Sequence, residues 1–199
     1  MDPASTRGSE PGSRPGAPPA GPSPPGRVTR ATALTLSTGL GVGLLPGAPG
    51  TYGSALAVGV FVVVSPMPGG LLLLSLLALG ALGVWSADVA ERVLGRADDG
   101  RIVIDEVLGQ LVALAPLWVL VPGSAGSWPW LVTGFVAFRC FDITKPGPVG
   151  WAERRFRGGL GVMMDDVVAG GLAALLLVAL ALVASSSFPL SLVGWREAP

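Results

Sequence analysis

The feature that most constrains this chain is a long run of uncharged residues near its C-terminus. Eighteen consecutive residues, from Val167 to Ala184, carry no charged side chain. A membrane-spanning helix needs about 20 mostly apolar residues, so this run predicts a transmembrane helix. Only 13% of the 199 residues are charged, against roughly 25% in an ordinary soluble domain, and the mean hydropathy is +0.64. Together these observations predict an integral membrane protein.

Other apolar stretches extend this prediction along the chain. Besides the run at 167–187, they cover residues 54–65, 69–87, 107–121 and 129–141. Three of them are shorter than a straight span, so we expect them to cross with help from flanking residues or to re-enter the membrane. The sequence therefore predicts an all-α fold: a polytopic membrane helical bundle with four to six membrane-embedded segments, some of them short or re-entrant.

The two ends of the chain differ in composition from its middle. Residues 1–26 contain eight prolines and five glycines with almost nothing to bury, and we expect residues 1–30 to be a disordered tail. Residues 31–187 are expected to form the membrane-embedded domain, and residues 188–199 a short C-terminal tail.

The distribution of basic residues predicts the orientation. Twelve of the thirteen Lys and Arg residues lie in the N-terminal region or in the connections at 87–106 and 139–166, and Arg196 is the exception. If the helices alternate in direction, these three regions fall on one side of the membrane. By the positive-inside rule that side is the cytoplasm.

Missing residue types exclude several functions. The chain has no histidine, which excludes a phosphohistidine intermediate, and its one cysteine, Cys140, lacks the arginine six positions later that a cysteine phosphatase loop requires. The net charge is zero and no basic stripe is present, so we expect no nucleic-acid partner. The oligomeric state stays open.

A glycine-rich stretch, "PGAPGTYGS" at 46–54, precedes the first apolar segment. Backbone N–H groups at such a helix start, together with the positive end of the helix dipole, suit a phosphate group. The stretch lacks the lysine of a nucleotide-binding loop, and a simple helix cap is the alternative. The candidate phosphate-binding residues here are Thr51, Gly53 and Ser54.

Acidic residues gather at the charged ends of three apolar segments. Asp105 and Glu106 begin the third segment, and Asp165 and Asp166 directly precede the long run. Between them, Arg139, Asp142 and Lys145 recur every three residues and would share one helix face, with Pro146 ending that helix. Helix caps and a salt-bridge ladder are the structural alternatives.

A hard divalent cation would resolve the mutual repulsion of five carboxylates, because Mg²⁺ prefers oxygen ligands and often binds carboxylates together with a substrate phosphate. The candidate metal ligands are Asp105, Glu106, Asp142, Asp165 and Asp166. A carboxylate–Mg²⁺ site beside phosphate-binding groups points to phosphoryl chemistry on a lipid headgroup. An ion-coupled transporter and a structural membrane protein are the alternatives from other classes.

Four motifs in order, "PGTYGS", "IVIDEVLGQ", "FVAFRCFDITKPGP" and "GGLGVMMDDVVAG", resemble the phosphatidylglycerophosphatase A family, a family of bacterial membrane lipid phosphatases. The resemblance runs from about residue 37 to 184. It implies Mg²⁺-dependent hydrolysis of the terminal phosphate of phosphatidylglycerophosphate, giving phosphatidylglycerol at the cytoplasmic face of the inner membrane. The membrane phospholipid is then the substrate and the bilayer the surrounding partner. A phosphatase or phosphotransferase for another lipid or isoprenoid phosphate is the nearest alternative.

The residue roles within this family are hypotheses. We expect the carboxylates to hold the metal and to orient or deprotonate the attacking water, and Arg139 and Lys145 to neutralise the phosphoryl oxygens. Direct attack by water and a phosphorylated aspartate are both compatible with these residues. The candidate catalytic residues are Asp105, Glu106, Asp142, Lys145, Asp165 and Asp166.

Overall fold

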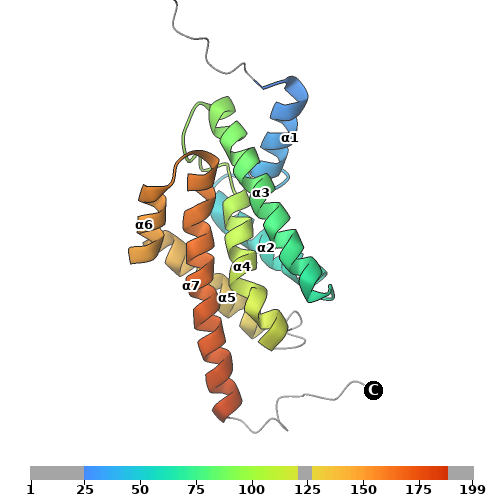
Figure 1. The fold of residues 1–199 in the computed structure, drawn as a ribbon, viewed down its shortest axis with the longest axis vertical. Helices are drawn as coiled ribbons and strands as arrows, with labels where there is room; N and C mark the ends of the chain where they lie inside the picture. Colours follow the sequence, from blue (N-terminus) through green and yellow to red (C-terminus); the bar gives the residue numbers. More distant parts are fainter. Residues whose placement is uncertain (1–24, 121–126, 188–199) are drawn as a thin grey trace, which may run out of the picture.

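A computed structural model of the chain describes residues 25–120 and 127–187, with side chains as far as residue 185. Within these ranges the chain forms seven α-helices and one short 3₁₀ helix, and no strand (Figure 1). The predicted all-α class is confirmed. The predicted C-terminal tail and most of the predicted N-terminal tail lie outside the described residues, and the first helix begins at Arg27.

The helices follow one another with short connections. In chain order they are α1 (Arg27–Ser37), the 3₁₀ helix η1 (Val42–Leu44), α2 (Pro49–Val64), α3 (Gly69–Leu94), α4 (Ile104–Leu120), α5 (Trp128–Thr144), α6 (Gly147–Arg155) and α7 (Gly158–Ser187). Helix α4 lies at the centre, against α2, α3, α5 and α7 (Figure 1). Helix α1 packs against α3, and α6 packs against α7.

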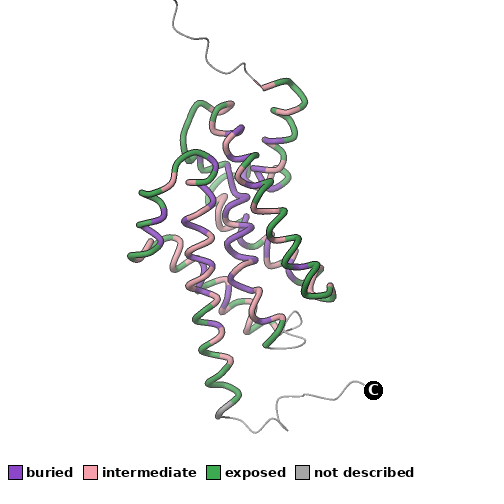
Figure 2. Tube along the Cα trace, viewed as in Figure 1, coloured by how far each residue is buried: buried purple, intermediate pink, exposed green. Residues whose placement is uncertain are grey.

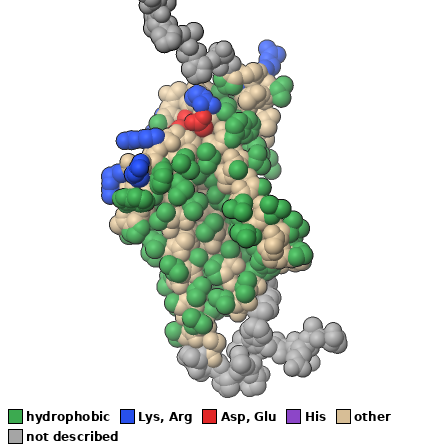
Figure 3. Space-filling model, in the orientation of Figure 1, with side chains coloured by type: hydrophobic (Ala, Val, Ile, Leu, Met, Phe, Trp, Pro, Cys, Tyr) green, Lys and Arg blue, Asp and Glu red, His purple; other side chains and the backbone are tan. Residues whose placement is uncertain are grey.

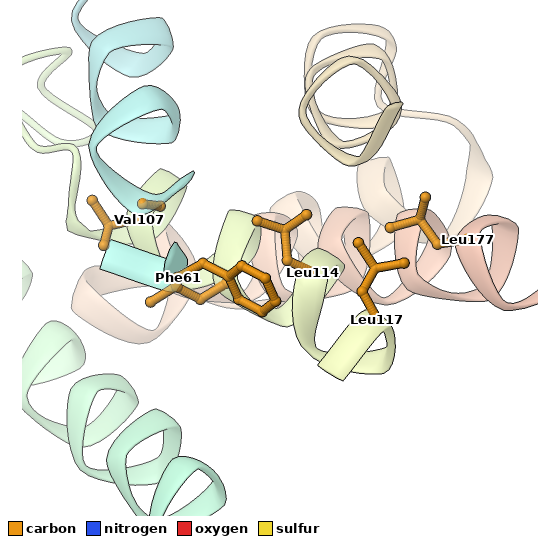
Figure 4. Packing of buried hydrophobic residues seen from close by; sticks show 7 residues of the cluster. Phe61, Val107, Leu114, Leu117 and Leu177 are labelled. Atoms are coloured by element: carbon orange, nitrogen blue, oxygen red, sulfur yellow. The ribbon is translucent and has the colours of Figure 1, made fainter. Parts of the chain in front are cut away.

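The central position of α4 follows from its sequence, which is apolar on nearly every side. Its buried residues are seen at the middle of the molecule, whereas the far half of α7 is mostly exposed or half-buried (Figure 2). Leu114 and Leu117 of α4 are fully buried against Phe61 of α2 and Leu177 of α7 (Figure 4). Between helices in a membrane such packing stabilises mainly through van der Waals contacts, because lipid tails are as apolar as a leucine side chain.

Two glycines set the distance between α4 and α7. A Cβ atom on Gly170 would lie 2.3 Å from the carbonyl oxygen of Gly109, and one on Gly109 would lie 2.7 Å from the carbonyl oxygen of Asp166. The two backbones are therefore in direct contact, as small residues allow between membrane helices. This contact fixes the relative position of every side chain on the facing surfaces.

Two helices, α3 and the part of α7 from Gly158 to Ser185, are long and apolar enough to cross a membrane, and α2 is a shorter apolar helix. Large apolar side chains of α3 point outward, among them Leu73, Leu74 and Leu77. The outer surface of the lower part of the molecule is largely hydrophobic, while the Lys, Arg, Asp and Glu side chains visible in this view gather at the opposite end (Figure 3). Association with a membrane follows from these features.

Two local predictions were wrong. Helix α7 begins at Gly158, so Asp165 and Asp166 lie inside the helix and do not precede it. Helix α5 ends at Thr144, and Lys145 is its C-cap with a left-handed φ of 45°, so Lys145 does not share a helix face with Arg139 and Asp142. Helix α7 begins seven residues before Asp165, about two turns, whereas α5 ends one residue before Lys145.

Candidate active site

Three carboxylates converge where α4 begins. Asp105 and Glu106 come from the first turn of α4 and Asp166 comes from α7, and one oxygen of each lies within 4.8 Å of the others. Asp105 is 8% exposed and Asp166 is 3% exposed. The glycine contact explains the convergence, because Asp105 and Asp166 each lie one turn before the glycine at which their helices touch. We call these three residues the acidic cluster.

The acidic cluster has unused hydrogen-bonding capacity. Asp105 Oδ1 and Glu106 Oε2 are buried without a hydrogen-bond partner in the described part of the chain. Buried charge of one sign is costly unless something compensates it. Several oxygen donors around one point fit a hard divalent cation, which prefers carboxylate oxygens and water. The cluster could therefore hold such a cation, and its ligands would be Asp105, Glu106 and Asp166.

A guanidinium group borders the acidic cluster. Arg139 Nη1 lies 2.7 Å from Asp142 Oδ2 and 3.9 Å from Glu106 Oε1, and the Arg139 side chain is only 16% exposed. Asp142 in turn lies close enough to Asp166 for their carboxylates to repel one another. Asp142 thus stands at the edge of the cluster, between a fixed positive charge and a ligand candidate. The ion pair of Arg139 with Asp142 is also the first step of the salt-bridge ladder considered as an alternative.

The start of α2 reaches the same place. A Cβ atom on Gly50 would lie 2.0 Å from Glu106 Oε1 and 3.3 Å from Arg139 Nη1, so a larger residue would displace the Glu106 side chain. The first N–H groups of a helix have no partner within the helix, and they carry the positive end of its dipole. The beginning of α2 therefore offers backbone donors beside the cluster and Arg139.

The three residues predicted to bind phosphate differ in their surroundings. Ser54 is fully buried, its hydroxyl donates to the Gly50 carbonyl at 2.9 Å, and Arg139 Nη1 donates to its Oγ at 3.5 Å. Gly53 packs against Val103, whose Cβ lies 2.9 Å from where a Gly53 Cβ would be. Thr51, in the first turn of α2, is half-buried. Of the three, Thr51 faces the fewest packing constraints.

Lys145 and Asp165 form a separate ionic group. The Lys145 ammonium donates to Asp165 at 2.8 Å and to Glu153 at 2.7 Å. Partial burial opposes the charge, but these two hydrogen bonds raise the pKa of Lys145 above its ordinary value. Asp165 points away from the cluster because adjacent helical residues are about 100° apart around the axis. A cavity of about 180 Å³, lined by Asp165, Glu153 and Arg157 among others, lies on this side.

Comparisons with known proteins identify the family of this chain. The sequence matches the model of the family described as phosphatidylglycerophosphatase A over residues 35–181. The chain belongs to this family. Its membership of the phosphatidylglycerophosphatase A family confirms the resemblance of the four motifs, and the matched range contains all five predicted metal ligands.

Three relatives cover most of the chain. A phosphatidylglycerophosphatase A of Escherichia coli K12 is 36% identical over 139 residues, which are 70% of this chain and 77% of the relative. One of Haemophilus influenzae is 36% identical over 135 residues, 67% of this chain and 79% of the relative. A protein of Bacteroides thetaiotaomicron, provisionally named a phosphatidylinositol-3-phosphatase, is 40% identical over 141 residues, 68% of this chain and 84% of the relative. No solved structure matches the chain.

Sequence reasoning overlooked three residues around the site of this family member. Gly50 forms the close approach of α2, Glu153 shares Lys145 with Asp165, and Gln110 is fully buried one turn after Glu106. Gln110 and Gly50 lie inside two of the motifs that carry the family resemblance. Their positions in these motifs were therefore the one sequence feature that could have pointed to them. Glu153 lies between motifs, and only the folded chain brings it to Lys145.

Proposed function

We propose that this chain hydrolyses the terminal phosphomonoester of phosphatidylglycerophosphate in a Mg²⁺-dependent reaction, releasing phosphatidylglycerol and inorganic phosphate. The observation that carries the proposal is membership of the phosphatidylglycerophosphatase A family over residues 35–181. Two relatives at 36% identity are named for this activity. The acidic cluster lies within the matched range and supports the same reaction class.

The metal part of the proposal rests on the acidic cluster. Asp105, Glu106 and Asp166 would hold Mg²⁺, because their buried oxygens lie close together and two of them lack a partner. The cation, when bound, supplies positive charge that offsets the charge of the phosphoryl oxygens. Asp142 and Asp165 remain predicted ligands; Asp142 pairs with Arg139, which also borders Glu106, whereas Asp165 pairs with Lys145.

The protein's own groups would handle the phosphate and the water. Arg139 and the first N–H groups of α2 can donate to phosphoryl oxygens beside the cluster, with the Thr51 hydroxyl as a further donor. Asp142 is the candidate to orient the attacking water and accept its proton, because it lies at the rim and is not wholly buried. Lys145 is proposed to add positive charge on the Asp165 side of the site, where its ammonium stays protonated.

We propose further that the chain is a multi-pass protein of the bacterial inner membrane, with four to six embedded segments and its active site facing the cytoplasm. Two helices have the length and composition of spans, and α2 is apolar but shorter. The basic side chains near the ends of α3, α5 and α6 support the orientation by the positive-inside rule. The shorter helices would complete the bundle as partial or re-entrant segments.

A different lipid phosphate is the second candidate substrate. It is favoured by one observation, the Bacteroides relative at 40% identity whose provisional name refers to a phosphatidylinositol phosphate. Both substrates present a phosphomonoester on a polyol headgroup, so the cluster and Arg139 would serve either. The choice between them depends on contacts to the headgroup.

Phosphate release tests the proposal directly. The full chain, purified in detergent and mixed with lipid micelles, should release inorganic phosphate from phosphatidylglycerophosphate faster than from phosphatidic acid, phosphatidylinositol 3-phosphate or an isoprenoid phosphate. EDTA should abolish release and Mg²⁺ should restore it. Asp166→Asn should lower the rate at least about 100-fold, since it removes a cluster charge. Asp88→Asn, in an exposed ion pair of α3, is the matched control and should leave the rate unchanged.

The outcomes separate the alternatives. Release from every lipid phosphate at one rate would contradict the headgroup preference, and release that persists in EDTA would contradict the metal dependence. A transporter or a structural protein would release no phosphate from any of these lipids.

A further inference from the structure

Gln110 is a polar residue that the proposed reaction has not used. It lies in the second turn of α4 and is completely buried. Neither its Nε2 nor its Oε1 has a hydrogen-bond partner in the described part of the chain. A buried amide without partners costs roughly 1–3 kcal/mol or more relative to a satisfied one. Native proteins contain few such groups, so this one calls for a physical reason.

The position of Gln110 relates it to the acidic cluster. It follows Glu106 by four residues, so the two share one face of α4, and helical side chains lean toward the N-terminal end of their helix. That end of α4 is where Asp105 and Glu106 meet Asp166. Asp105 Oδ1 and Glu106 Oε2 also lack partners. Three neighbouring residues of α4 therefore have unsatisfied polar atoms that do not satisfy one another.

Hydrogen-bond chemistry indicates what could satisfy all three residues together. The carboxylates only accept, while the carboxamide both donates and accepts. A cation surrounded by water fits this combination, because the carboxylates bind the ion and the amide oxygen accepts from its water. Mg²⁺ is known to keep several waters in protein sites.

We infer that Gln110 belongs to the cation site, where its carboxamide hydrogen-bonds to the water shell of the bound ion and thereby positions Glu106. This inference rests on the proposed function, since it requires the cluster to bind a cation. It assigns Gln110 as a positioning residue. Groups in this position typically change metal affinity 10- to 100-fold when they are replaced.

The test uses Gln110→Leu, which keeps the approximate volume and removes both polar atoms, with Gln110→Met as a second variant. Replacing an unsatisfied amide by an apolar group should leave the thermal unfolding temperature of the metal-free protein unchanged or raise it. The Mg²⁺ concentration that gives half of the full Mg²⁺-induced rise in unfolding temperature should increase at least tenfold. The Mg²⁺ concentration for half-maximal phosphate release should rise in parallel, with the lipid KM unchanged.

Leu114→Met provides the matched control. Leu114 lies one turn further along the same face of α4 and is equally buried. A volume-conserving exchange there should change the unfolding temperature of the metal-free protein by no more than a few degrees. It should leave the Mg²⁺ dependence unchanged. It reports how the core of α4 responds to a change of shape alone.

The possible results are distinguishable. If Mg²⁺ raises the unfolding temperature of wild type and both Gln110 variants with the same half-maximal concentration, the inference is overturned while the cation site stands. If Mg²⁺ does not stabilise the wild type at all, the metal part of the proposed function fails together with the inference. If both variants unfold at a markedly lower temperature without metal, the amide serves the fold itself, and this also overturns the inference.

Discussion

Two adjacent glycines of α7 allow a sharp test of how the active site is assembled. A Cβ atom on Gly170 would lie 2.3 Å from the Gly109 carbonyl oxygen, 3.1 Å from the Gly109 carbonyl carbon and 3.2 Å from its Cα. All three atoms belong to backbone, which cannot rotate away. At Gly171 a Cβ atom would meet nothing within 4 Å. We therefore predict opposite effects for Gly170→Ala and Gly171→Ala.

The size of the effect follows from the contact distances. A carbon–oxygen contact between helices is comfortable at about 3.3 Å, so Gly170→Ala must push α4 and α7 apart by about 1 Å. Overpacking of this kind costs about 1–3 kcal/mol, offset by up to about 1 kcal/mol because alanine favours a helix over glycine. Gly171→Ala should gain that helix preference without the clash.

Catalysis should respond more strongly than stability. Asp105 and Asp166 each lie one turn before the contact, so separating the helices moves their carboxylates apart by a similar amount. Mg²⁺ requires oxygen ligands at about 2.1 Å in near-octahedral geometry. A misplacement of about 1 Å can cost about 100-fold in rate. We expect a loss of this order for Gly170→Ala and a rate near wild type for Gly171→Ala.

The assay combines Mg²⁺-dependent phosphate release with thermal unfolding of the same preparations in detergent. Equal rates for wild type and Gly170→Ala would refute the claim that the glycine contact sets the carboxylate geometry. Equal losses in the two variants would refute it as well, because the effect would then follow from any change in α7 backbone preference.

Three further predictions address other parts of the molecule. Asp142→Asn should preserve membrane insertion but lower Mg²⁺-dependent phosphate release at least about 100-fold, and near-wild-type turnover would remove Asp142 from the proposed mechanism. Hydrogen bonds from Arg101 lower the pKa of Asp99 from 3.8 to about 2, so this ion pair stabilises the fold above about pH 4 and stops doing so as the pH falls toward 2. The free energy of unfolding of Asp99→Asn should therefore lie below that of wild type at pH 7 and converge with it near pH 2, and a constant difference would contradict the assignment. In a chain whose natural cysteine has been removed, a cysteine replacing Gly100 should react with membrane-impermeant reagents only from the cytoplasmic side. A cysteine replacing Pro68 should react only from the opposite side. Labelling of both positions from one side would overturn the proposed orientation.

The order of hydrophobic and charged residues along the chain was sufficient to predict most of the helices. Long apolar runs without charge predict helices, because a helix is the only membrane structure in which one segment satisfies its own backbone polar groups. Each of the five predicted stretches coincides with a helix, namely α2, α3, α4, α5 and α7, whereas α1 and α6 were not predicted. The first turn of α4 carries Asp105 and Glu106 as expected. The motif order alone was enough to recognise the family.

Which acidic residues lie together in space could not be predicted from the sequence. Asp165 and Asp166 are equivalent as neighbours in the sequence, yet Asp166 joins Asp105 and Asp165 pairs with Lys145. Which of two adjacent residues faces inward depends on the angular position of the helix. That position is set by where α7 begins and by its contact with Gly109, more than 50 residues away in the sequence.

The sequence by itself thus determined the membrane character, most of the helices, the carboxylate residues that are candidates for the site, and the family. Only the tertiary structure decided which carboxylates share a site, that Gly170 must be glycine, and that Gln110 has no hydrogen-bond partner in the described part of the chain. The physical reason is the distance along the chain over which each effect acts. Hydropathy and charge act on each segment separately, whereas the meeting of side chains depends on contacts between helices that are resolved to about 1 Å.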